Sequence, residues 1–382
     1  MLSLFRKMAG AGAAPLGIDC GSRLLKAVQL RRGAGGYGLV AAAAAPVPAA
    51  AWEDAAALAA FFRRDVRRLL ASSGFRGRQA ILALPAHHMH ATSVREQRPG
   101  GATSDPSTEP APGWLPFDAS EALVRRIEAG DVYDAAGRSR EVVTLAVHRH
   151  IIARYVEAAA AAGLDVVGVA AEPEALLAAL ALSGADSRLM RLVVDLGLSC
   201  TRVYAGMGRR LLFARRLRTC GRDLEAAVSA ALGVGPEEAC SLRTKLPPLD
   251  HKHDAVPDER LRKVDQACQE TVFRLVTEIR LCLGYVSAVF GNTPVHHVVF
   301  VGGGAKYRRL CQRVASGLGL PARAADPIGR LVRTDGAPAA GGPVWATAVG
   351  LALQGARMAA PVGASEPSAT EDNAIARLTL AV

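Results

Sequence analysis

Two Asp-x-Gly motifs are the features of this chain whose residue types and spacing could do chemistry. Asp19-x-Gly21 and Asp195-x-Gly197 each end an apolar run and precede a small polar turn. Glycine adopts backbone conformations closed to other residues and lets the chain approach a ligand closely. Successive N–H groups of such a turn form a concavity that binds anions. Carboxylates repel phosphate unless a hydrated Mg²⁺ lies between them, so each motif predicts a phosphate loop that also serves a metal ion.

The two motifs belong to an internal repeat. Residues 16–30 read LGIDCGSRLLKAVQL, and residues 192–206 read LVVDLGLSCTRVYAG. Each copy has an apolar strand, a turn and a second apolar strand, and each continues through a tip rich in glycine and arginine into a third strand. One such turn is common, but two at matching places indicate two related domains that share a phosphate site. The turns add hydroxyl donors from Ser22, Ser199 and Thr201.

A third element has three consecutive glycines. Residues 297–305 read HVVFVGGGA, a buried strand followed by Gly302, Gly303 and Gly304 and then a helix. A glycine-rich turn from strand to helix offers free N–H groups to an anion, or lets a flat base approach the backbone. The pattern is not GxGxxG, and no acidic residue follows at the spacing that contacts a ribose, so a dinucleotide-binding fold is disfavoured.

The elements that position these motifs alternate between strands and helices, which indicates α/β layering. At 382 residues the chain is long enough for two domains, each with its own core. Three stretches have the composition of linkers or tails: 97–113, 247–257 and 359–382. Apolar periodicity predicts helices at 53–72, 151–162, 173–182, 221–232, 258–290 and 306–318.

Bulk properties exclude several classes of protein. The seven cysteines are dispersed and none forms a CxxC pair, which indicates a reducing compartment rather than a disulfide framework. No apolar run reaches the roughly 18–20 residues that span a bilayer, and no RNA- or DNA-binding module is legible. The net charge of +11 favours acidic partners. These properties predict a soluble cytoplasmic protein that does not bind nucleic acid.

The three motifs, in this order, resemble the first phosphate loop, second phosphate loop and adenosine loop of the actin-like ATPase superfamily. Within it, the chain resembles the type IV pilus assembly protein PilM family, relatives of the cell-division protein FtsA, over most of residues 15–355. The segments that narrow the resemblance are LPFDASEAL (115–123), RYVEAAAAAGLDVVGVAAEPEALLAAL (154–180) and ADPIGRL (325–331).

The resemblance implies a duplicated actin-like (ribonuclease H-like) α/β fold, with two domains around a nucleotide cleft and a small inserted subdomain. The implied division is a flexible N-terminus at 1–14, domain I at 15–190 with the insertion at about 115–190, domain II at 191–330, a helix that returns to domain I at 331–355, and a disordered tail at 356–382.

The resemblance also implies ATP and Mg²⁺ in the cleft, with the metal ion held, through water, by Asp19 and Asp195. The residues expected to contact the nucleotide are Asp19, Gly21, Ser22, Arg23, Lys26, Asp195, Gly197, Ser199, Cys200, Thr201, Gly221, Arg243, Gly302, Gly303 and Gly304.

The chain departs from the superfamily at the helix that contacts the nucleoside. FtsA-related proteins carry an acidic and a basic residue three apart on a helix against the nucleoside, and here the aligned pair is Cys240 and Arg243, with Glu238 offset. Cysteine is a weak acceptor for ribose hydroxyls. Glu172 is the candidate catalytic residue, placed where chaperone ATPases orient the attacking water, although a carboxylate there also interacts with a helix dipole. Hydrolysis is therefore expected to be slow or undetectable.

The implied function is that of a nucleotide-binding scaffold at the cytoplasmic face of the inner membrane. It would bind the N-terminal segment of a PilN-like membrane protein and other pilus assembly proteins. Gln79–Leu84 and Val142–His148 are candidate strands for the incoming peptide, unless they simply complete a sheet. Other functions remain open: an actin-like ATPase, a small-molecule kinase or an FtsA-like division protein.

Overall fold

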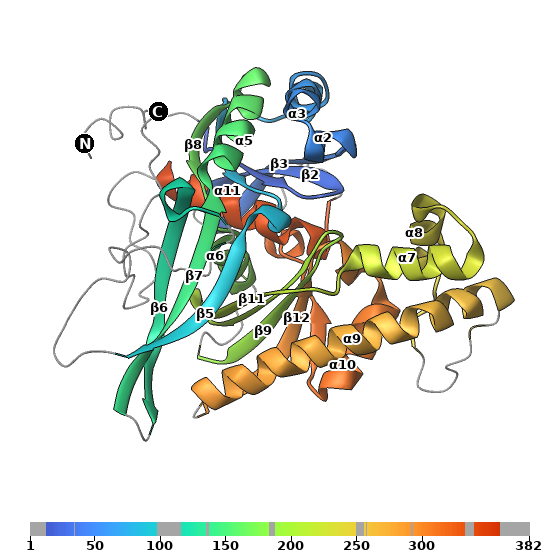
Figure 1. Ribbon diagram of the computed structural model, residues 1–382. Helices are drawn as coiled ribbons and strands as arrows, with labels where there is room; N and C mark the ends of the chain where they lie inside the picture. Colours follow the sequence, from blue (N-terminus) through green and yellow to red (C-terminus); the bar gives the residue numbers. More distant parts are fainter. Residues whose placement is uncertain are drawn as a thin grey trace.

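The computed structural model describes residues 13–33, 35–97, 115, 117–134, 137–182, 188–249, 256, 258–291, 293–332 and 340–359. These residues form three β-sheets and the helices that pack against them (Figure 1). The expectations for the N-terminus, for the linker at 97–113 and for the C-terminal tail lie almost entirely outside the described residues.

The first sheet has the strand order β3-β2-β1-β4-β8. Its first three strands form an antiparallel meander, β4 runs parallel to β1, and β8 runs parallel to β4. The strands are β1 (Leu16–Cys20), β2 (Leu24–Gly33), β3 (Gly36–Pro46), β4 (Gln79–Ala83) and β8 (Asp165–Val169).

The second sheet repeats this plan with the order β11-β10-β9-β12-β13. Three antiparallel strands are again followed by a parallel strand on the other side of the first one, so the repeat in the sequence is a repeat of the fold. All residues of β9 are buried, as the apolar run Leu192, Val193 and Val194 predicts for a central strand, and the polar residues Arg191 and Asp195 are buried with them. The strands are β9 (Met190–Leu196), β10 (Thr201–Met207), β11 (Arg210–Leu217), β12 (Val295–Val301) and β13 (Ala322–Ala324).

Helices cover both faces of the first sheet. Along β4, Leu82 packs with the cluster that includes α3 and α5, whereas Ile81 packs with α6 and α11 on the opposite face. The helices predicted at 53–72, 151–162 and 173–182 all form, the first with a π-helical turn at its centre. Their bounds are α2 (Ala50–Glu53), α3 (Ala55–Phe61), the π turn (Phe62–Val66), α4 (Arg67–Ser72), α5 (Arg149–Ala161), α6 (Glu172–Ala181) and α11 (Ala346–Met358).

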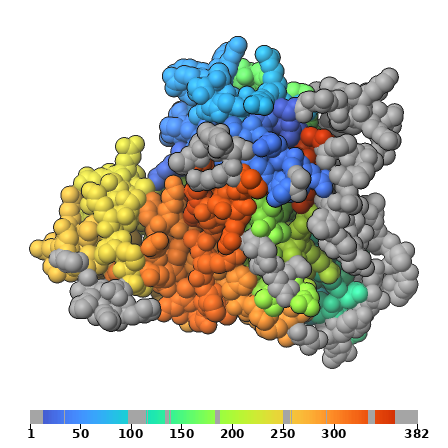
Figure 2. All heavy atoms as spheres, turned by 180° about the vertical axis from the view of Figure 1, so that it is seen from behind, coloured from blue at the N-terminus to red at the C-terminus, as the bar shows by residue number. Residues whose placement is uncertain are grey.

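The second half carries α7 (Gly221–Leu232), α8 (Pro236–Thr244), α9 (Glu259–Val289) and α10 (Arg308–Leu318). The Asp258 side chain accepts a hydrogen bond from the Leu261 N–H and so caps α9, as its sequence position predicts. Among the described helices, none is long and apolar enough to cross a membrane. Seen from behind, the first half (blue) stands above the second (yellow to orange) (Figure 2).

A third sheet, with the order β5-β7-β6, lies beside the second half (Figure 1). It is built from β5 (His90–Gln97), β6 (Ala122–Asp134) and β7 (Gly137–His148). The sequence predicted a subdomain at about 115–190. The third sheet begins earlier than this, because β5 pairs with β7. It also ends earlier, because α5 and β8 join the layers of the first half. Pairing between strands so far apart in sequence leaves no local pattern from which to set the boundary.

The two candidate strands for an incoming peptide are interior. Gln79–Leu84 contains β4, which lies between β1 and β8, and Val142–His148 belongs to β7, which lies between β5 and β6. Both sides of each strand are paired within the sheets, so neither can accept another strand and this expectation is wrong. The described strands with one unpaired side include β8 in the first sheet and β6 in the third.

Helix α11 crosses α6 at a point where only glycine fits. A Cβ added to Gly350 would stand 1.8 Å from the Ala175 carbonyl oxygen, which belongs to the backbone of α6. Backbone cannot move aside as the end of a flexible side chain can, so this contact fixes how closely α11 packs on the first half. Gly284, in an exposed part of α9, meets nothing within 4 Å.

We predict that Gly350→Ala lowers the melting temperature by roughly 4–10 °C, because overpacking at a fixed contact costs about 1–3 kcal/mol or more. Gly284→Ala is the matched control and should raise the melting temperature slightly, since alanine is the better helix former by about 1 kcal/mol. Differential scanning calorimetry measures both. Equal shifts for the two variants would contradict the close packing of α11 on α6.

Candidate functional site

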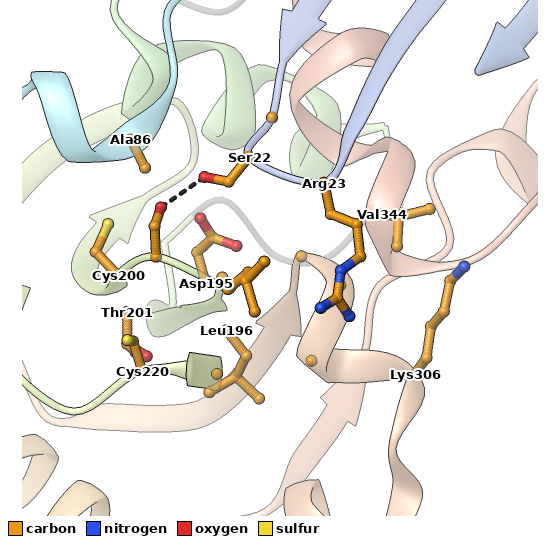
Figure 3. A pocket seen from close by; sticks show the side chains of 18 of the residues that line it. Ser22, Arg23, Ala86, Asp195, Leu196, Cys200, Thr201, Cys220, Lys306 and Val344 are labelled. Atoms are coloured by element: carbon orange, nitrogen blue, oxygen red, sulfur yellow. Dashed lines mark hydrogen bonds between the residues drawn. The ribbon is translucent and has the colours of Figure 1, made fainter. Parts of the chain in front are cut away.

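The turns of the two repeated hairpins face each other across a cavity of about 470 Å³. The hairpin β1–β2 comes from the first half and β9–β10 from the second, and the glycines after β12 form a third wall (Figure 3). Every residue predicted above to contact nucleotide lines this one cavity, and so does Glu172. The sequence therefore identified residues that the fold brings together, whereas their binding roles stay predictions.

Direct contacts join the two halves across the cavity. The Ser22 and Ser199 hydroxyls are 2.5 Å apart, and the dashed line in Figure 3 starts at Ser22. The Arg23 guanidinium donates a hydrogen bond to the carboxylate of Glu225 in α7, at 3.0 Å. It also donates to the sulfur of Cys240 in α8, at 2.8 Å. The first hairpin is thus tied to the helices of the second half.

Each hairpin carries an aspartate paired with a cation on the neighbouring strand. Asp19 lies opposite Lys26 in the β1–β2 register, and Lys26 Nζ is 2.5 Å from Asp19 Oδ2. Asp195 lies opposite Arg202 in the β9–β10 register, and Arg202 donates to Asp195 Oδ2 at 2.5 Å. The sequence analysis missed Arg202, although aligning the two copies places it where Lys26 stands.

Arg202 also pairs with Glu172, the first residue of α6. Glu172 is 3% exposed, and Asp195 and Arg202 are each 6% exposed. Burial raises the pKa of Asp195 to about 7; the charge of Asp19 raises it further and that of Lys26 opposes the rise. Burial lowers the pKa of the Arg202 guanidinium. Removing one member would leave a buried charge unpaired, which costs about 3–5 kcal/mol in proteins.

This arrangement does not fit the Mg²⁺ site expected at Asp19 and Asp195. Both carboxylates already accept from a cationic side chain, and Glu172 shares the cation of Asp195. Within the described part of the chain, no group of three or more His, Cys, Asp or Glu side chains is arranged to hold a metal ion. Mg²⁺ holds a near-octahedral shell of oxygens and loses water reluctantly, and an ion between Asp19 and Asp195 would lie beside the cations Lys26 and Arg202.

The glycines after β12 pack directly on the second hairpin. Gly302 has a φ of +83°, and a Cβ there would stand 2.1 Å from Asp195 Oδ1. A Cβ on Gly304 would stand 2.7 Å from the Leu196 Cβ, whereas one on Gly303 meets nothing within 4 Å. Gly302 and Gly304 therefore permit the close approach of the loop, and Gly303 leaves space at the cavity.

Cys240 and Arg243 of α8, which align with the acidic and basic residues of FtsA-related proteins, line the same cavity. The Arg243 guanidinium stacks on the Tyr307 ring at 4.8 Å, and the Cys240 sulfur is 3.4 Å from the Tyr307 hydroxyl. Glu238 pairs instead with Arg260, and both side chains are about half exposed. Lys306 and Tyr307 also line the cavity, but they were not among the residues predicted from the sequence. They follow Gly304 within three positions, and neither belongs to a residue pattern that marks a binding site.

Two halves of equal topology around a shared cleft, with a hairpin turn from each half facing into it, define the actin-like α/β class of proteins. A family model described as "Type IV pilus assembly protein PilM" matches residues 116–356. That match covers more than half of the chain, and the chain belongs to this family, whose members take part in type IV pilus assembly. The expected fold class and family are thereby confirmed.

Solved structures agree with this fold. The structure entitled "PilM-PilN type IV pilus biogenesis complex" is similar with a TM-score of 0.70 and 20% identity, over 90% of this chain and 98% of that one. The ethanolamine utilization protein EutJ from Carboxydothermus hydrogenoformans is similar with a TM-score of 0.52 and 16% identity, over 92% of this chain and 96% of that one.

We predict that Cys240 is the cysteine modified fastest by N-ethylmaleimide. It is partly exposed at the cavity, whereas five of the other cysteines are buried. Cys311 is also partly exposed, but burial raises the pKa of its thiol to about 12, and the thiolate is the reacting form. Peptide mass spectrometry over a time course measures the order. Cys240→Ala should remove the fast phase, and a fast phase that persists in this variant contradicts the prediction.

Proposed function

We propose that this member of the PilM family is a nucleotide-binding scaffold whose ligand is ATP, held in the cavity between the two hairpins. The observation that carries the proposal is the meeting of three separate glycine-containing turns at one cavity of about 470 Å³. Ligand pockets of small molecules span about 300–1,000 Å³. Turns with free N–H groups suit phosphates, and the Gly302–Gly304 loop suits a flat base.

The charge of the cavity supports an anionic ligand. Its lining has the carboxylates of Asp19, Glu172, Asp195 and Glu225 and the cations of Arg23, Lys26, Arg202, Arg243 and Lys306. Four of the five cations are paired with these carboxylates. Lys306 makes no ion pair with any described residue, so its ammonium group is available to a phosphate. Figure 3 shows Lys306 and Arg23 on the same side of the cavity.

The same charge pattern argues against the alternative of a small-molecule kinase. A kinase needs a carboxylate that accepts the proton of the acceptor hydroxyl. In the described cleft, Asp19, Asp195 and Glu172 each pair with a cation instead. No observation favours the kinase or the FtsA-like division protein over the scaffold.

We further propose that the partner is the N-terminal segment of a PilN-like inner-membrane protein, which would hold this chain at the cytoplasmic face of that membrane. The support is membership of the PilM family together with similarity to a structure entitled as a PilM–PilN complex. Extended peptides commonly bind by adding to the edge of a sheet. The described edge strands, which include β8 and β6, are candidates for such an addition.

The third sheet gives the cleft a means of influencing a partner. The chain leaves the first half through β4, enters β5, and returns through β7 into α5. Yet the sheet packs on the second half, where Tyr285 of α9 donates to Glu141 at 2.7 Å and the Ala214 N–H donates to Ser93 Oγ at 3.1 Å. A ligand that changes the angle between the two halves would move the third sheet relative to the first sheet.

We predict that isothermal titration calorimetry detects ATP binding and that Gly303→Val weakens it at least about tenfold, or 1.4 kcal/mol. A Cβ at this position would meet nothing within 4 Å, so the valine side chain would extend into open space at the cavity. Gly235→Val, at an equally open position outside the cavity, is the matched control and should bind ATP normally. Absence of ATP binding by folded wild-type protein would contradict the proposed ligand.

We predict that ATP hydrolysis is slow or undetectable, well below the roughly 1–10³ s⁻¹ of typical enzymes. Glu172 is buried against Arg202 and is therefore a poor base for water. A phosphate-release assay on wild type and on Glu172→Gln should give the same low rate. Turnover in the enzymatic range that disappears in Glu172→Gln would show that the chain is a catalyst.

We predict saturable binding of a fluorescent peptide from the N-terminal segment of a PilN-like protein, measured by anisotropy with and without ATP. A scrambled peptide is the control for charge and should not bind. A peptide methylated at alternate backbone nitrogens should lose binding, because strand addition uses these N–H groups. Equal binding of all three peptides, or of none, would overturn the proposed partner contact.

A further inference from the structure

The second hairpin carries a cation at the place that matches Lys26 of the first. Asp19 and Lys26 are cross-strand partners, and so are Asp195 and Arg202. Both pairs line the same cavity. Lys26 and Arg202 therefore approach the cavity from opposite halves, at equivalent positions of the repeat.

Arg202 is fixed in place by both halves. Its guanidinium pairs with Asp195 of the second half and with Glu172 of the first, and all three side chains are more than nine-tenths buried. Arg202 Nε has no hydrogen-bond acceptor among the described residues. A guanidinium has five N–H donors in a rigid plane and stays charged in proteins. The site thus contains a permanent cation with donor capacity that the protein does not use.

A metal ion at this position would duplicate that cation. Asp19, Asp195 and Glu172 together bring three negative charges, and Lys26 and Arg202 bring two positive ones. Without the two side-chain cations, the buried carboxylates of Asp195 and Glu172 and the partly buried one of Asp19 would lack a counter-charge from the protein. With them, the end of the cavity is nearly neutral, and one oxygen of each carboxylate pairs with a cationic side chain, whereas Glu172 Oε1 has no hydrogen-bond donor among the described residues.

We propose that the Arg202 guanidinium, facing Lys26, takes the place of the divalent cation, so that this chain binds ATP as the metal-free anion. The inference rests on the proposed ATP site. Arg202 then determines which form of the nucleotide binds. The positive charges of Lys26 and of the free Lys306 ammonium group further offset the negative charge of the triphosphate.

The experiment is a calorimetric titration of the full chain with ATP, in excess EDTA and in excess Mg²⁺. The wild type should bind with dissociation constants that agree within about threefold. Arg202→Gln should bind ATP at least about tenfold more weakly in EDTA than the wild type does. It should regain part of this affinity in Mg²⁺, because Asp195 and Glu172 no longer pair with Arg202 and are open to the ion. Arg202→Lys should keep binding in EDTA, because it keeps the charge.

Arg215→Gln is the matched control: it removes an exposed cation from the neighbouring strand, outside the cavity, and should behave as wild type. Melting temperatures show whether each variant is folded. If Arg202→Gln does not fold, the comparison of wild-type affinity in EDTA and in Mg²⁺ still tests the proposal. Wild-type binding at least tenfold weaker in EDTA than in Mg²⁺ overturns the role of Arg202 and leaves the ATP site standing. No binding in either condition overturns both.

Discussion

The ion-paired cluster of Arg202 with Asp195 and Glu172 is the interaction on which the arrangement of the cleft depends. Glu172 begins α6 of the first half, and the other two belong to the hairpin of the second half. Because all three are buried, none can lose its partner without a large penalty. The cluster therefore holds the second hairpin against the first half and fixes the width of the cavity between them.

Weaker contacts also join the two halves across the cavity. The Ser22–Ser199 hydrogen bond and the reach of Arg23 to Glu225 and Cys240 cross between the halves at partly exposed positions. Exposed pairs contribute little to stability, about 0–1 kcal/mol. A ligand could replace these contacts at small cost, whereas the buried cluster would stay in place. Opening of the cleft would be transmitted to the third sheet, which is covalently continuous with the first half and packed on the second.

The local chemistry of the site could be predicted from the sequence, whereas its long-range pairs could not. Asp19, Asp195 and the three glycines after β12 lie in short motifs whose geometry is set by the neighbouring residues, and the fold brings them to one cavity. The partner of Arg23 lies 202 positions away at Glu225. The third sheet was misplaced for the same reason, since β5 pairs with β7 across a long connection. Residue patterns encode strands and turns, but not which distant strand becomes a neighbour.

Hydrogen–deuterium exchange is the most direct test of whether the facing hairpins and the glycine loop form one nucleotide site. Exchange of the full chain would be followed by mass spectrometry with and without saturating ATP. We expect ATP to slow exchange in all three segments, at residues 19–26, 195–202 and 302–307. Unchanged exchange in these segments, or protection confined to one of the two halves, would show that the three segments do not form one nucleotide site.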